Sequence, residues 1–242
     1  MFKEAIEKIV SLAGASTFDI CGRTFADREL HEVREELDMP STEKLFSLDA
    51  LVKKVKAEAV ETSPALPVFV SVSKYNEVEC SSRIVEHMRS SRILYYVAHA
   101  SDIPGLEANS KFGFEQAQIA LQTRFQPTPD RDYLLRLCSQ ITCGGKVTYN
   151  DNGIATSIIT QKGVALQGTE AIKPLVSLKP YRTFQEVEQP ESLFLIRVDE
   201  RGVSFIEADG GMWKLAARQT VKKFLEEELS ALVEAGDVIV TL

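Results

Sequence analysis

Apolar and polar residues recur with two different periods along the chain, and the change of period separates expected helices from expected strands. Apolar residues three or four positions apart are typical of a helix with one buried face, whereas alternation in steps of two is typical of a half-buried strand. Helical spacing predicts helices over residues 2–13, 47–60, 114–125, 130–141 and 211–233. Strand-like spacing predicts two short strands within residues 17–26 and further strands over 30–37, 67–73, 77–81, 92–98, 145–150, 154–160, 164–166, 175–178, 193–198, 203–207 and 238–242.

Turn residues lie between these segments and indicate how the elements follow one another. Asn152-Gly153 is a strong hairpin signal, because both residues readily adopt the positive φ of a tight turn. Pro127 and Pro129 fix a corner between the two central helices. Runs of neighbouring strands with helices in blocks predict an α+β fold, a mainly antiparallel sheet with helices packed on it. We expect a single domain over residues 1–242, with a weak division near residues 100–112.

Composition adds that the chain is an ordinary globular protein. It has 242 residues, of which 44% are hydrophobic and 26% charged, and these values exclude collagen-like, low-complexity and largely disordered proteins. No apolar run approaches the roughly 20 residues that span a bilayer. Charged residues interrupt the N-terminal segment 1–10, where a signal peptide would be apolar. We therefore expect a cytoplasmic protein that does not bind membranes.

The cysteines and histidines form no metal-binding or catalytic motif. Cys21, Cys80, Cys138 and Cys143 include no pair with C-x-x-C spacing, and the histidines are scattered. We expect four reduced cysteines that pack as small core residues, with no metal and no cofactor. His99 is expected to be hydrogen-bonded or solvent-facing. The G-x-S-x-G elbow of a serine nucleophile is absent, so no catalytic residue is predicted.

Charge is distributed unevenly along the chain. The formal net charge is −7, but residues 111–184 hold nine Lys or Arg against five Asp or Glu, and residues 185–242 hold six against twelve. A basic middle with interleaved aromatic residues is one signature of nucleic-acid binding. The excess is small, since nonspecific DNA binders carry a denser basic face. The partner is therefore left open between a protein and a nucleic acid.

A strand leads through two glycines into a helix at residues 207–214, and this turn is the first candidate site. One interpretation is an anion held at the start of the helix, with Lys214 as its counter-ion. The favoured interpretation is that Asp209 caps the same N–H groups and that the glycines allow close packing. The candidate residues of this turn are Glu207, Asp209, Gly210, Gly211, Trp213 and Lys214.

The polar and aromatic segment 179–190 is the second candidate site. Arg182 offers five donors that suit a carboxylate or phosphate, and Tyr181 or Phe184 offers a ring to stack on a base or on a partner side chain. Loops that pin themselves to a core have the same composition. We favour this structural interpretation for Arg182, with Glu186 or Glu188 as its partner.

A divalent cation is a further interpretation of the acidic residues. Glu207 and Asp209 offer oxygen ligands, which Glu186 or Glu188 would join if the sheet brought them near. A metal-dependent hydrolase that uses Glu207, Asp209 and Glu186 is therefore one function to consider. Two neighbouring acids are too few for a site, so we predict no metal centre.

Three segments, 178–184, 186–192 and 205–214, resemble a family of uncharacterised bacteriophage and prophage proteins of Gram-positive bacteria. The likeness extends over most of the chain, including the helix 114–125 and the hairpin at 151–153, and the chain is distantly similar to the YfdQ-like prophage proteins. The resemblance implies a setting, since members look like early-region phage proteins encoded among recombination and single-strand-binding genes. It brings no catalytic residues with it.

The sequence favours a non-enzymatic phage or prophage accessory protein that binds a macromolecular partner in phage DNA metabolism or host takeover. An alternative is a counter-defence protein that sequesters a nucleotide signal or inhibits a host enzyme, with an anion at the Tyr181-Arg182 loop or the Gly210-Gly211 helix start. A homo-oligomer is left open. We expect the partner at the seam between Arg182 and residues 207–214.

Overall fold

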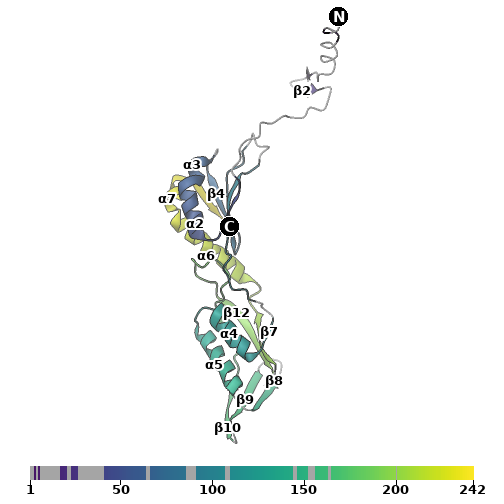
Figure 1. Ribbon diagram of the computed structural model, residues 1–242, viewed down its shortest axis with the longest axis vertical. Coiled ribbons are helices and arrows are strands. Elements are labelled where there is room, and N and C mark those ends of the chain that lie inside the picture. Colours follow the sequence, from purple (N-terminus) through teal and green to yellow (C-terminus); the bar gives the residue numbers. More distant parts are fainter. Residues whose placement is uncertain are drawn as a thin grey trace. The chain divides into compact units, whose positions relative to one another are not determined.

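The computed structural model describes residues 3, 5, 17–20, 23–26, 41–63, 66–85, 91–106, 110–143, 146–151, 156–162, 165–199 and 201–242 (Figure 1). Contacts within the chain divide it into two units, Met1–Met39 and Pro40–Leu242. That the whole chain is a single domain stays a prediction.

The N-terminal unit contains one described pair of strands. Strands β1 (Thr17–Ile20) and β2 (Arg23–Ala26) are antiparallel, with Phe18 opposite Phe25, which confirms the two predicted short strands. The expected strand over residues 30–37 lies outside the described residues. So does the expected helix over residues 2–13, except at two single positions that are helical.

The first core of the larger unit lies between a five-stranded sheet and helices on one face of it (Figure 1). Its elements are β3 (Glu43–Leu45), α2 (Leu48–Lys54), the π-helical turn η1 (Val55–Ala59), α3 (Val60–Thr62), β4 (Val68–Lys74), β5 (Glu77–Ser81), β6 (Leu94–His99), α6 (Met212–Glu228), α7 (Ser230–Ala235) and β14 (Val238–Thr241). The strand order is β14-β4-β5-β6-β3, and the two end strands run parallel to their neighbours. Alternation along β4 buries Val68, Val70 and Val72 completely.

The second core lies between a four-stranded antiparallel sheet and two helices. Its elements are β7 (Lys111–Phe112), α4 (Phe114–Arg124), α5 (Pro129–Cys143), β11 (Leu175–Leu178), β12 (Ser192–Asp199) and β13 (Gly202–Glu207). The strand order is β11-β12-β13-β7. Phe194 and Phe205 lie on the inner face of this sheet and contact the core formed with α4 and α5. On the outer face, Leu175 and Leu193 remain exposed.

A third sheet completes the described part of the larger unit. Strands β8 (Lys146–Asp151), β9 (Thr156–Lys162) and β10 (Ala165–Ala171) are antiparallel in the order β10-β9-β8. Pairing of Asp151 with Thr156 confirms the predicted hairpin, although its turn lies outside the described residues. The α+β prediction with mainly antiparallel strands is thus confirmed. No helix among the described residues is long and apolar enough to cross a membrane.

Two predicted helices differ from the observed ones. The helix expected over 47–60 contains the π-helical turn η1, and the helix expected over 211–233 breaks at Leu229 into α6 and α7. The strands β3 and β7 were not predicted, because three and two residues are too short to show alternation.

Candidate functional site

Arg182 is the central side chain of the seam. It follows β11 and is only 6% exposed, with its guanidinium carbon 4.3 Å from the ring centre of Trp213 and 5.2 Å from that of Phe194. Its Nη2 lies 2.6 Å from Glu207 Oε1, and its Nη1 donates a hydrogen bond of 3.3 Å to Ser192 Oγ. Burial lowers the pKa of Arg182, while the nearby carboxylates oppose that shift. Arg182 is therefore a buried tie between a loop and a sheet.

The predicted partner of Arg182 was wrong. Glu186 Oε1 instead accepts a hydrogen bond of 2.8 Å from the backbone N–H of Leu48, at the start of α2, where a carboxylate is favoured. Glu188 pairs with Lys179 at 2.7 Å. Glu207 is the partner because it lies opposite Phe194 in the β12–β13 ladder, on the face that the guanidinium covers.

Gln189, which sequence reasoning missed, holds the loop around Arg182. Its Oε1 accepts hydrogen bonds from the backbone N–H groups of Arg182 and Thr183, at 2.9 and 3.2 Å. Its Nε2 donates to the carbonyl oxygens of Phe184 and Val187. The side chain is buried, but nothing in the sequence separates a buried glutamine from the exposed polar residues around it.

Asp209 caps α6, as predicted. Its Oδ1 accepts a hydrogen bond of 3.0 Å from Gly211 N, and its Oδ2 accepts one of 3.3 Å from Trp213 N. An anion at this helix start would have to displace that carboxylate. Lys214 Nζ lies 5.7 Å from the ring centre of Trp213, and its role as a counter-ion stays a prediction.

The role predicted for the two glycines was wrong. A Cβ added to Gly210 or Gly211 would meet nothing within 4 Å, so close packing does not require them. Both residues instead have a positive φ, +63° for Gly210 and +81° for Gly211. Residues other than glycine rarely adopt this left-handed backbone conformation. The glycines therefore provide the turn between β13 and α6.

Two hollows flank the seam, and Trp213 lines both. The inner hollow has a volume of about 380 Å³. It is lined by Tyr75, Tyr181, Arg182 and Glu207, and by residues 100, 101 and 103–106. The outer hollow, of about 280 Å³, lies between α6 and the β11–β12 strands. Its lining includes Ser177, Glu191, Leu193, Asp209, Met212 and Leu215. The indole Nε1 of Trp213 is buried and has no hydrogen-bond partner among the described residues.

The structure thus brings most of the predicted site residues together, although not all in one hollow. Tyr181, Arg182, Glu207 and Trp213 share the inner hollow, whereas Asp209 lines the outer one. Glu186 lines neither of these but a third hollow of about 310 Å³, which shares residues 100, 101 and 103 with the inner one. The sequence did not indicate the leucines and Met212 of the outer hollow, because exposed apolar residues on a helix or strand resemble core residues until the fold is known.

The three carboxylates considered for a hydrolase are engaged separately. Glu207 pairs with Arg182, Asp209 caps α6 and Glu186 binds the start of α2. Among the residues that the structure describes, no group of three or more His, Cys, Asp or Glu side chains is placed to hold a metal ion.

Ion pairs neutralise much of the basic middle of the chain. Five of its nine cations, Lys111, Arg131, Lys173, Lys179 and Arg182, pair with Asp199, Asp132, Asp130, Glu188 and Glu207 respectively. The side chains of Lys146 and Lys162 lie outside the described part of the structure. Pairing with a carboxylate reduces the attraction of each of these five cations for a phosphate group.

Cys80 and Cys138 are buried in the core, and His99 lies next to Glu77. Burial raises the pKa of Cys80 to about 12 and that of Cys138 to about 11, so both remain thiols. This confirms the core prediction for these two; the side chains of Cys21 and Cys143 lie outside the described residues. His99 Nδ1 lies 3.4 Å from Glu77 Oε2, and the imidazole is half-buried.

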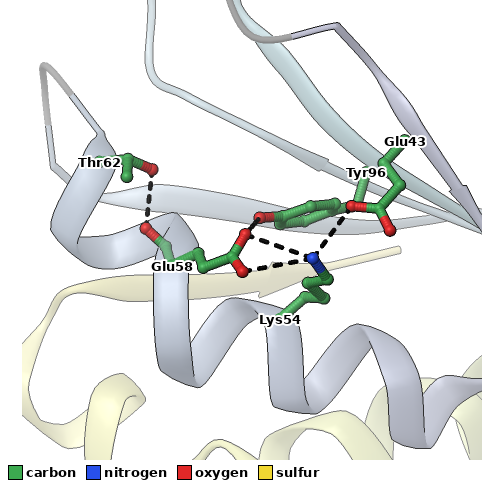
Figure 2. A network of polar contacts seen from close by, with 5 residues as sticks. All are labelled: Glu43, Lys54, Glu58, Thr62 and Tyr96. Atoms are coloured by element: carbon green, nitrogen blue, oxygen red, sulfur yellow. Dashed lines mark hydrogen bonds and ion pairs between the residues drawn. The ribbon is translucent and has the colours of Figure 1, made fainter.

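A separate polar network joins the helical segment α2–η1–α3 to strands β3 and β6 of the five-stranded sheet (Figure 2). Tyr96 on β6 donates a hydrogen bond of 2.9 Å to Glu58 Oε2 on η1. Lys54 Nζ lies 3.2 Å from both Glu58 and Glu43, and Thr62 donates to the carbonyl oxygen of Glu58. The hydrogen bond from Tyr96, followed by that from Lys54, lowers the pKa of Glu58. Sequence reasoning missed this network, because only the fold brings Glu43 on β3 and Tyr96 on β6 next to Lys54 and Glu58.

Comparisons of the chain with protein-family models, curated proteins and solved structures gave no match.

Proposed function

We propose that the chain is a non-enzymatic accessory protein of a bacteriophage or prophage that acts in the host-cell cytoplasm by binding a partner protein. One observation carries the proposal. Met212, Leu193 and Leu215, which line the outer hollow, are 66%, 47% and 43% exposed beside a buried Trp213. Contiguous exposed apolar side chains mark interaction surfaces, and tryptophan and arginine are enriched where binding energy concentrates.

The charged groups of the seam support binding rather than catalysis. Arg182 is held by Glu207 and Ser192, and the carboxylate of Asp209 is held by the first N–H groups of α6. These side chains shape the surface and position Trp213. The phage setting rests on the sequence resemblance, which concerns segments that include this seam.

Affinity capture with a point variant tests the proposal. The tagged chain is expressed in a Gram-positive host during phage growth, and captured proteins are quantified by mass spectrometry after nuclease treatment. We expect one partner protein that survives the nuclease and falls at least about tenfold with Leu215→Asn, because a polar group in an interface core costs over 1 kcal/mol. Ile119→Asn, at an exposed apolar position of α4, is the matched control and retains the partner.

Three outcomes would contradict this function. Nuclease treatment would release the partner if nucleic acid carried the binding. Recovery of only further copies of the chain would indicate self-association. Equal capture by Leu215→Asn and the unchanged chain would place the binding surface elsewhere.

A further inference from the structure

The helix α6 has two apolar stripes, and only one of them is buried. Trp213, Ala217, Val221 and Leu225 contact the protein interior. Met212, with Leu215 three and Ala216 four residues further on, forms a second, exposed stripe that lines the outer hollow, and the polar Gln219 continues it. A helix that packs on the core with one face and meets solvent with the other needs only one apolar stripe. The second stripe is unpartnered among the described residues.

The opposite wall of the outer hollow consists of side chains on the outer face of the β11–β12 strand pair. Leu193 on β12 lies opposite Ser177 on β11, and both line the hollow. Leu175 lies two residues before Ser177, on the same outer face, and is exposed. The hollow opens on the outer face of the β11–β12 pair and not at the free edge of β11, so an occupant of the hollow meets side chains and no row of free backbone groups. The side chains of this wall, such as Leu193, instead contact a side chain that a partner inserts into the hollow.

These two walls suit a helix better than an extended segment. A groove with apolar walls binds an amphipathic helix through anchors spaced three and four residues apart, and the Met212–Gln219 stripe has the same spacing. An extended peptide would need free backbone groups at a sheet edge. The occupant we consider is therefore one amphipathic helix.

The charged residues that line the outer hollow indicate which charge the bound helix would carry. Its ionisable lining residues among those described are Glu191 and Asp209, both acidic. Glu191 is exposed and lies beside Ser177, whose hydroxyl donates to it. Complementary charge favours a partner with lysine or arginine beside its apolar anchors.

We infer that the outer hollow binds a basic amphipathic helix of the partner protein, with aliphatic anchors between α6 and Leu193 and cations facing Glu191. This inference rests on the proposed function and specifies the partner element. It is distinct from a nucleic-acid or nucleotide site, because the hollow presents carboxylates and apolar groups.

Three synthetic peptides of eighteen residues test the inference on the full chain. One carries leucines on a single helical face and lysines elsewhere, the second replaces every lysine by glutamate, and the third is a scramble of the first. Trp213, the only tryptophan, reports binding by fluorescence. Methyl NMR of the four methionines locates it, with Met212 assigned by Met212→Leu.

We expect the leucine–lysine peptide to bind at least about tenfold more tightly than the other two peptides and to shift the Met212 methyl signal. Leu215→Asn should weaken it, whereas Ile119→Asn should not. Glu191→Lys should reverse the preference toward the leucine–glutamate peptide, since the peptide charge would then match the new cation. Glu115→Lys, an exposed charge reversal on α4, is its control and should leave the preference unchanged.

Equal binding of the lysine, glutamate and scrambled peptides would overturn the inference, as would binding that Leu215→Asn and Glu191→Lys leave unchanged. A chain that forms dimers which Leu215→Asn dissociates would show that a second copy occupies the hollow, and would also overturn it. If capture of the natural partner depends on Leu215 while no peptide binds, the proposed function stands and the basic helix is wrong. If capture is independent of Leu215, the proposed function itself fails.

Discussion

At the scale of single residues, the contact between Tyr96 and Glu58 shows how a hydrogen bond couples a fold to pH (Figure 2). The phenol donates to the ionised carboxylate, which is the stronger form of the bond. It therefore stabilises ionised Glu58 in the folded chain and lowers the pKa of Glu58 below 4.5, its ordinary value. This contact therefore favours folding more strongly while Glu58 is ionised.

Tyr96→Phe should destabilise the protein at pH 7 and have a smaller effect at pH 3. A group whose pKa is lowered on folding contributes stability above its ordinary pKa, and loses it as the pH falls through the folded value. Urea unfolding at the two pH values measures this difference. In a Glu58→Gln background the effect of Tyr96→Phe should not change with pH. A pH-independent effect in the natural background would contradict the assignment.

Arg182 shows which part of a site is predictable at this scale. Its density of donors in a polar loop correctly indicates a tie to the core. The hairpin turn between β12 and β13 also places Glu207 opposite Phe194. What the sequence lacks is the path of the loop 179–191, which depends on hydrogen bonds from the buried Gln189. Local periodicity contains no information on that path. The predicted ion-pair partner of Arg182 was wrong for this reason.

At the scale of elements, the β12–β13 hairpin depends on one glycine. Gly202 has a φ of +144°, and a Cβ at this position would overlap the carbonyl oxygen of Phe112 on the neighbouring strand β7. The close approach lets β7 join the sheet next to β13. Only a residue without a side chain combines this backbone conformation with that contact.

Gly202→Ala should therefore lower the free energy of unfolding by about 2–4 kcal/mol, since it adds both backbone strain and a clash with backbone atoms. For a chain of this size the expected fall in Tm is roughly 5–15 °C. Gly105→Ala is the control, because a Cβ there meets nothing within 4 Å. Thermal melts followed by circular dichroism measure both variants, and equal melting temperatures would contradict the role given to Gly202.

Element types were predictable where a long periodic segment decides them. The helices α4 and α5 and the β12–β13 hairpin were found, because burial on one face imposes the period directly. The π-helical turn η1 and the break at Leu229 were missed. Both leave the apolar spacing nearly unchanged, and tertiary packing rather than local preference determines them.

At the scale of the larger unit, the segment between β11 and β12 joins two cores. Leu178 and Phe194, at its two ends, belong to the second core, whereas Phe184 and Val187 belong to the first. Thr183 also donates a hydrogen bond to the carbonyl oxygen of Tyr75. The chain thus leaves one core, inserts two side chains into the other and returns.

Phe184→Ala should loosen this connection. Removal of a buried phenylalanine side chain costs about 3–5 kcal/mol, and here the loss falls on the first core. We expect faster amide hydrogen exchange in β4–β6 than in β11–β13. Phe125→Ala, whose side chain belongs to the second core alone, should show the opposite pattern. Equal loss of protection in both sheets for each variant would contradict the separation of the two cores.

The parallel pairing of β14 with β4 has a consequence for synthesis. Val238 pairs with Val68, and at roughly 5–20 residues per second a ribosome needs about 10–30 s to make the intervening chain. During that interval the backbone edge of β4 that later pairs with β14 has no permanent neighbour, and its three valines are not yet covered by α6 and α7. An unpaired apolar edge invites pairing with other nascent chains. Production of this protein should therefore depend on chaperones that shield β4 until its last partner is made.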